Sequence, residues 1–223
     1  ERSGGGRAYF AVVSDHGFVA VQREVNLNAV LRQAGLQRDV RDFRAYAWSA
    51  GGVAAIQLRD ADAETRERTE RVLRGFMNYP ETPILRIETG TEAAVRGGFP
   101  KAAFVVYLRP GFVHSEDAEA PVLRPATVRG AHGHDAGLSE MEAALVLAGP
   151  GVPAGKDIGR ADMRDVAPTL ARLLGLTLPK AEGRDLLADL VHRSEAAPPE
   201  PGGDGSVGAL GGAAAAAATI AAP

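Results

Sequence analysis

Tyr9-Phe10-Ala11-Val12-Val13-Ser14-Asp15-His16-Gly17-Phe18 is an apolar run that ends in a carboxylate, an imidazole and a glycine. Residues 9–13 have the pattern typical of a short strand that is buried on both sides of a sheet. Asp15 and His16 follow at the carboxyl end of this strand, where open α/β sheets place their ligands. Gly17 permits a turn, so both side chains can serve one site. This stretch predicts a central strand that leads into a polar site.

Two interpretations of the Asp15-His16-Gly17 turn are open at this point. Carboxylate and imidazole groups are good ligands for zinc or a similar divalent ion. The same three residues can also form a plain turn, in which the carboxylate of Asp15 accepts hydrogen bonds from nearby backbone amides. Further residues elsewhere in the chain must decide between the two.

The composition is ordinary for a globular protein of 223 residues, with 45% hydrophobic and 24% charged residues. A net charge of -3 argues against a nucleic-acid groove that binds through phosphate contacts. Cysteine is absent, which excludes disulfide bonds and thiolate metal sites. No apolar run approaches the roughly 18 residues of a membrane span.

Apolar periodicity and capping residues predict alternating strands and helices, and therefore an α/β sheet that is largely parallel and flanked by helices. The expected helices cover residues 26–35, 60–78, 91–96 and 162–174. The further strands expected after residues 9–13 cover residues 43–48, 53–58, 84–88, 102–108, 112–114 and 143–148. We expect one domain over residues 1–190, followed by a low-complexity, disordered tail over residues 195–223.

A second candidate loop contains His132, which lies between Gly130 and Gly133. Flanking glycines allow the backbone to approach a metal or substrate closely. We do not count the neighbouring His134 as a ligand, although it can lie close to substrate. His114 is interpreted as a surface histidine or one with its hydrogen bonds satisfied. The aromatic residues Phe99, Tyr107 and Phe112 can stack on a base, but aromatic residues in strands more often belong to the core.

These segments together resemble a known family. Residues 12–18, followed by residues 25–28 and Gly35-Leu36, resemble the second half of the type I phosphodiesterase/nucleotide pyrophosphatase group of the alkaline phosphatase superfamily. The segment from Arg129 to Gly133 is similar to the Gly-x-His-Gly motif of that family. Residues 148–151 and 165–176 resemble its closing strand and helix. The resemblance spans roughly residues 8 to 187.

The resemblance implies an alkaline-phosphatase-like fold and phosphoryl transfer at a two-zinc site. Asp15 and His16 match the Asp-His pair of one metal, and His132 matches the late histidine of the other. Two metal ions can hold the nucleophile, the leaving oxygen and the phosphoryl oxygens. The implied substrate is a small phosphodiester or nucleotide.

The chain also departs from the family pattern. The metal-binding Asp, the Ser or Thr nucleophile and the Asp-x-x-x-His motif of the family's first half have no counterpart here, so no catalytic nucleophile is assigned. We therefore expect the C-terminal half of such an enzyme, with negligible activity by itself. Alternatives are a sulfatase or phosphomutase relative and a non-catalytic module with one metal held by Asp15, His16 and His132. Localisation and oligomeric state stay open.

Overall fold

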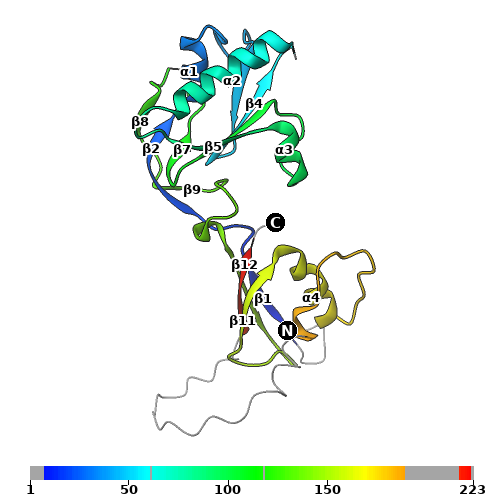
Figure 1. Ribbon diagram of the computed structural model, residues 1–223. Helices are drawn as coiled ribbons and strands as arrows, with labels where there is room; N and C mark the ends of the chain where they lie inside the picture. The colour runs from blue at the N-terminus through cyan, green and yellow to red at the C-terminus, as the bar shows by residue number, and fades with distance from the viewer. Residues whose placement is uncertain (1–7, 61, 118, 189–215, 222–223) are drawn as a thin grey trace. The chain divides into compact units, whose positions relative to one another are not determined.

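The computed structural model describes residues 8–60, 62–117, 119–188 and 216–221. The described residues form two compact units (Figure 1): unit 1 contains residues 8–17, 142–188 and 216–221, and unit 2 contains the described residues from 18 to 141. Each unit combines strands with helices, so the expected α/β class is confirmed. The expected division into a domain of residues 1–190 and a tail from residue 195 has its boundary outside the described residues and stays a prediction.

The main sheet of unit 2 has the strand order β3-β4-β6-β5, and every neighbouring pair is antiparallel. Its strands are β3 (Ala45–Ser49), β4 (Val53–Leu58), β5 (Ile84–Thr89) and β6 (Phe104–Leu108), and its helices are α1 (Leu27–Gln33), α2 (Ala63–Met77) and α3 (Gly90–Val95). Helices α1 and α2 pack on one face of this sheet (Figure 1). The core between them contains Leu31, Leu73 and Phe104, all almost fully buried.

Capping residues fix the ends of these helices. The Asn26 side chain accepts a 3.0 Å hydrogen bond from the Ala29 backbone N–H and so begins α1. Gly35 follows the end of α1 with φ +68°, a conformation that glycine adopts without steric cost. Asp62 caps α2 in the same way, through a 2.7 Å bond from the Thr65 N–H.

A second, smaller sheet of unit 2 is built around β2 (Val19–Val25). Strand β2 pairs in parallel with β7 (Gly111–His114) and antiparallel with β8 (Leu123–Pro125) and β9 (Gly130–Ala131). Because β9 is followed directly by His132, this pairing determines where the histidine loop begins.

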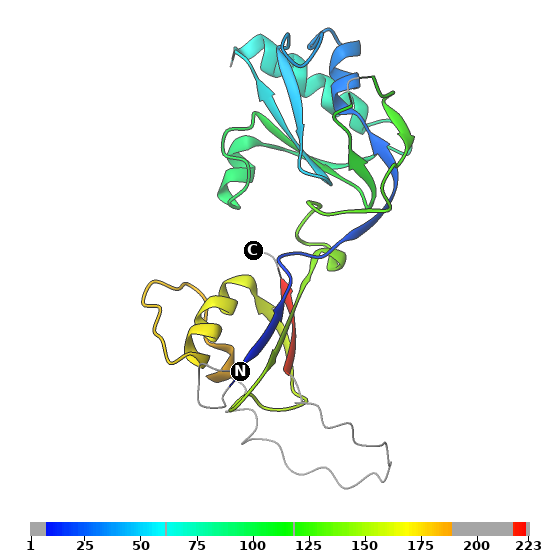
Figure 2. The same ribbon diagram turned by 180° about the vertical axis from the view of Figure 1, so that it is seen from behind.

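Unit 1 has the strand order β1-β10-β12-β11 (Figure 2). The strands are β1 (Phe10–Val13), β10 (Ala143–Ala148), β11 (Asp157–Asp162) and β12 (Ala216–Ala221). A 3₁₀ turn over Met163–Asp165 leads into helix α4 (Val166–Leu173), and a second 3₁₀ turn, Ser139–Met141, ends unit 2. Leu170 and Leu173 of α4 pack on a core that contains Leu145 and Leu147.

Strand β1 does not lie at the centre of a sheet, which corrects our expectation. It is the edge strand of the unit 1 sheet, and all four of its residues are exposed, with Phe10 65% and Val12 67% exposed. An apolar run is compatible with a buried strand, but burial also depends on which strands and helices pack around it.

The strand directions also differ from the expected, largely parallel sheet. Among the strand pairs of the described residues, only β11–β12 and β2–β7 are parallel. Strands β3 and β4 are joined by a short turn at Gly51-Gly52, and such a connection allows antiparallel pairing alone.

Part of the expected disordered tail is a strand. Residues 216–221 form β12, which pairs with both β10 and β11. Pairing between two strands needs backbone groups and not a strongly apolar sequence, so these six residues can form a strand despite their composition. Residues 195–215 and 222–223 lie outside the described residues. Among the helices of the described segments, none has the length and apolar character needed to cross a membrane.

Candidate functional site

The Asp15-His16 turn extends directly from β1 in unit 1. Ser14 fixes this end of the strand, because its N–H donates to Ala144 O at 3.0 Å and its Oγ accepts from the Ala144 N–H at 2.8 Å. Asp15 Oδ1 accepts a hydrogen bond from the His16 backbone N–H at 3.1 Å. The strand therefore ends in a turn that holds the two side chains together.

The side chains of Asp15 and His16 face each other at the spacing of two metal ligands. His16 Nδ1 donates to Gly17 O at 2.8 Å, which leaves Nε2 as the nitrogen with a lone pair. His16 Nε2 and Asp15 Oδ2 are 3.5 Å apart. Ligands that bind one tetrahedral zinc ion at 2.0–2.2 Å are about 3.4 Å apart. This pair thus fits a divalent ion in kind and in spacing.

His132 lies in unit 2, in the loop after β9, where two glycine turns interlock. Its carbonyl accepts a 2.9 Å hydrogen bond from the Gly52 N–H, and its ring centroid is 6.4 Å from that of Phe18. A Cβ atom on Gly51 would lie 2.2 Å from His132 O, and one on Gly133 would lie 1.7 Å from Ala50 O. The β3–β4 turn and the histidine loop approach this closely only because both positions are glycine.

His134 is buried beneath this interlock. It is 5% exposed, its Nε2 bonds to Phe112 O at 2.8 Å, and a Cβ on Gly52 would collide with its ring. Burial lowers the pKa of His134, although the bond to Phe112 acts in the opposite direction. The side chain is a packing element of the loop. Whether it lies close to substrate stays a prediction.

His114 corrects the expectation of a surface or satisfied histidine. It is 5% exposed, and neither ring nitrogen has a hydrogen-bond partner among the described residues. Burial lowers its pKa to about 4, so the ring is neutral at pH 7. Phe112 and Tyr107 pack partly buried against core clusters, as expected, whereas Phe99 is 36% exposed.

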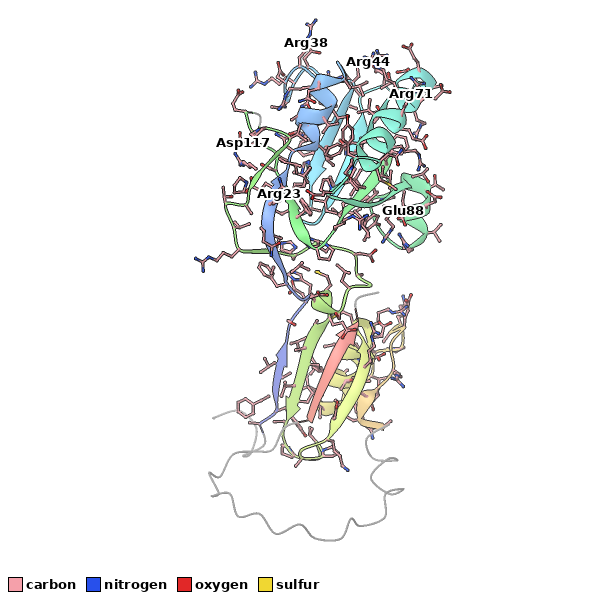
Figure 3. All side chains as sticks on the ribbon, turned by 60° about the vertical axis from the view of Figure 1, so that its left-hand side comes forward. Arg23, Arg38, Arg44, Arg71, Glu88 and Asp117 are labelled. Atoms are coloured by element: carbon pink, nitrogen blue, oxygen red, sulfur yellow. The ribbon has the colours of Figure 1, made fainter. Side chains whose placement is uncertain are left out.

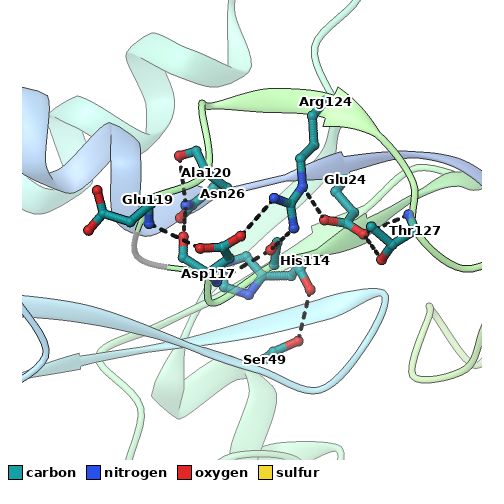
Figure 4. A network of polar contacts seen from close by, with 10 residues as sticks. Glu24, Asn26, Ser49, His114, Asp117, Glu119, Ala120, Arg124 and Thr127 are labelled. Atoms are coloured by element: carbon teal, nitrogen blue, oxygen red, sulfur yellow. Dashed lines mark hydrogen bonds and ion pairs between the residues drawn. The ribbon is translucent and has the colours of Figure 1, made fainter.

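A polar network in unit 2 could not be seen in the sequence (Figure 4). Glu24, 5% exposed on β2, accepts hydrogen bonds from Arg124 Nε at 2.7 Å and from the Thr127 N–H at 2.8 Å. Burial opposes the ionisation of Glu24, but these bonds outweigh it and lower its pKa. Arg124 also binds Asp117, at 2.7 Å. The network fastens the segment after β7 onto β2.

Asp15, His16 and His132 are suitable metal ligands by their chemistry, but three ligands do not complete the coordination of two ions. Asp15 and His16 belong to unit 1 and His132 to unit 2, and no group of three or more His, Asp or Glu side chains that could hold an ion occurs among the described residues. Two metal ions require more ligands than these three supply. No catalytic step is therefore derived through a metal.

Comparison with solved structures finds similar folds. The fold is similar to human ectonucleotide pyrophosphatase/phosphodiesterase 5, with a TM-score of 0.59 at 17% identity, over 81% of this chain and 44% of that chain. The murine protein gives a TM-score of 0.54 at 20% identity, over 78% of this chain and 43% of that chain. An inactive variant of the murine protein in complex with AMP gives 0.53 at 19% identity, over 81% and 44% of the two chains.

The chain thus spans less than half the length of these structures. No curated protein sequence matches it. The sequence profile of the type I phosphodiesterase/nucleotide pyrophosphatase family matches residues 2–135, more than half of the chain. This match shows that the chain belongs to the type I phosphodiesterase/nucleotide pyrophosphatase family.

Proposed function

We propose that this chain contributes metal ligands to a hydrolase of phosphodiester or pyrophosphate bonds. The family is metal-dependent. The observation that carries the proposal is the 3.5 Å separation of Asp15 Oδ2 and His16 Nε2, together with the 2.8 Å hydrogen bond from His16 Nδ1 to Gly17 O. In this proposal Asp15 and His16 hold one divalent ion and His132 holds another, most simply zinc in both cases.

Each residue has a defined task in this proposal. The carboxylate of Asp15 supplies negative charge to its ion, and the Gly17 carbonyl orients the imidazole of His16, as carbonyl groups commonly do for metal-bound histidines. The interlocked glycines hold the backbone of His132 at a fixed place. A bound metal pair would stabilise the charge of the phosphoryl group during transfer.

The substrate class is a nucleotide or another small phosphodiester. Support comes from the murine relative that was solved with AMP. We assign no nucleophile within these 223 residues, and the three ligands leave both ion sites with open positions. The isolated chain is therefore expected to hydrolyse a p-nitrophenyl phosphodiester at a negligible rate.

Zinc stoichiometry tests the proposal. The chain is purified without chelator, titrated with zinc, and its metal content is compared with that of the variants Asp15→Ala, His16→Ala and His132→Ala. Asp42→Ala is the matched control, because this exposed carboxylate lies outside both loops. We expect Asp15→Ala and His16→Ala to lose one ion and His132→Ala to lose a different one.

Two other results have clear meanings. Loss of the same single ion in all three variants supports a non-catalytic module with one metal in place of the two-metal hydrolase. Equal zinc content in the wild type and the three variants contradicts both assignments.

A further inference from the structure

Unit 2 contains a polar cavity of about 300 Å³ whose lining includes none of the residues assigned above to metal binding. It is formed by α1, the loop after α1, strand β3 and the segment after β7. The lining residues on which the inference depends are Arg32, Arg38, Tyr46, Glu116 and Glu119. The volume is at the small end of the range for ligand pockets, which favours a ligand of the size of a single metabolite.

Tyr46 lines the cavity together with these charged groups. The residue is only 6% exposed, yet its hydroxyl makes no hydrogen bond with any of the described residues. Burial and the negative charge of Glu116 raise the pKa of Tyr46, while Arg32 acts in the opposite direction. The charges of Arg32 and Glu116 therefore both act on the hydroxyl of Tyr46, a residue that is buried apart from the part that lines the cavity.

Several lining charges are already engaged. Arg38 pairs with Asp42 at 3.5 Å (Figure 3 labels Arg38), and Glu116 Oε1 accepts a hydrogen bond from the Ser49 N–H. The side chains of Arg32 and Glu119 have no hydrogen bond or ion pair within the described part of the chain. Asp39 also lines the cavity, and its Oδ1 accepts hydrogen bonds from the N–H groups of Arg41 and Asp42 at 2.7 and 2.9 Å. Arg32 is thus the available cation and Glu119 the carboxylate without a hydrogen bond, and the Tyr46 hydroxyl and the second oxygen of Glu116 belong to the same lining.

We propose that this cavity binds a small zwitterion that carries one carboxylate and one ammonium group, of the class of free amino acids. The guanidinium of Arg32 can bind the carboxylate through two parallel hydrogen bonds, and the Tyr46 hydroxyl donates a third. The ammonium group donates to Glu119 and to the second oxygen of Glu116. A dianion meets the carboxylates and a dication meets Arg32, so either bears an unfavourable like-charge contact. This inference goes beyond the proposed hydrolase and does not depend on it.

Calorimetric titration of the full chain tests the inference. The probes are the free amino acids, with succinate and putrescine as comparators of similar size that carry one sign of charge. We expect at least one amino acid to bind, and Arg32→Gln and Glu119→Gln each to weaken its affinity at least tenfold. Neither position is deeply buried, so both variants should fold, which circular dichroism verifies.

Arg71→Gln is the matched control, since Arg71 is exposed on α2 outside the cavity lining (Figure 3), and this variant should bind as the wild type does. Tighter or equal binding of succinate or putrescine would overturn the assignment of a zwitterion. Absence of binding by every amino acid to the folded chain would overturn the site itself.

Discussion

The backbone N–H of Gly52 donates a 2.9 Å hydrogen bond to the carbonyl oxygen of His132 and so ties the β3–β4 turn to the histidine loop. Gly52 and His132 are 80 residues apart in the sequence. The glycines on both sides remove the Cβ atoms that would keep these backbones apart. The position of His132 therefore depends on a turn that carries no functional side chain.

Gly51→Ala should destabilise unit 2 more than Gly97→Ala does. Both glycines have positive φ, +80° and +83°, so both substitutions bear the strain of roughly 1–2 kcal/mol for a left-handed alanine. Only the Cβ at Gly51 also collides with His132 O, whereas Gly97 has nothing within 4 Å. This collision adds about 1–3 kcal/mol of overpacking to the cost of Gly51→Ala. Urea unfolding of the two variants measures the difference. Equal free energies of unfolding for the two variants would show that the interlock contributes nothing.

His114 should make the fold sensitive to acid. Its pKa is lowered to about 4 in the folded chain, below the value of about 6.5 of an unfolded histidine. Between these two pH values His114 is protonated in the unfolded chain but not in the folded chain. The contribution of His114 therefore lowers the free energy of unfolding as the pH falls from 6.5 to 4, and this contribution is constant below pH 4. The shift corresponds to about 3 kcal/mol.

The measurement is urea unfolding at several pH values between 4 and 7, for the wild type and for His114→Leu. Carboxylates titrate in both proteins, so the difference between the two curves isolates the histidine. The wild type should lose stability relative to His114→Leu as the pH falls through this window. Parallel curves would mean that the imidazole gains a proton without penalty.

Arg124→Met should destabilise unit 2 by about 1–3 kcal/mol, because it leaves the buried carboxylate of Glu24 without its charged partner. Asp42→Ala, which breaks the exposed Arg38–Asp42 pair, should change stability by less than about 0.5 kcal/mol. Thermal unfolding of the two variants compares them directly. An effect of Arg124→Met as small as that of Asp42→Ala would refute a stabilising role for the network.

The exposed position of β1 can be tested by truncation. Val12→Ala should cost less than about 0.5 kcal/mol, because Val12 is 67% exposed. Leu145→Ala in the neighbouring β10 should cost about 2–5 kcal/mol, because Leu145 is 1% exposed. A cost above 1 kcal/mol for Val12→Ala would contradict the exposed position of β1 and favour the buried central strand expected from the sequence.

Local signals in the sequence predicted much of the secondary structure. Helix α2 was expected over residues 60–78 and covers Ala63–Met77, because paired Glu and Arg residues four apart and a capping Asp62 act locally. Strands β4 and β10 have the expected bounds. Strand β2 was missed because it contains Arg23 and Glu24, and Glu24 is buried only through Arg124, 100 residues away. Long-range pairing of this kind leaves no local pattern.

The candidate site divides in the same way. The sequence placed Asp15 and His16 at the carboxyl end of one strand, and in the structure their side chains are 3.5 Å apart. The glycine interlock around His132 depends on contacts between backbones that are distant in the sequence. No residue pattern near His132 could reveal its partner at Gly52. The assignment of all three residues as metal ligands stays a prediction.

Anomalous diffraction at the zinc edge, from crystals of the chain grown with zinc, tests the central claim most directly. The account predicts one anomalous peak about 2.0–2.2 Å from Asp15 Oδ2 and His16 Nε2, and a second peak at a ring nitrogen of His132. Zinc peaks at other side chains only, with no density at Asp15, His16 or His132, would contradict it.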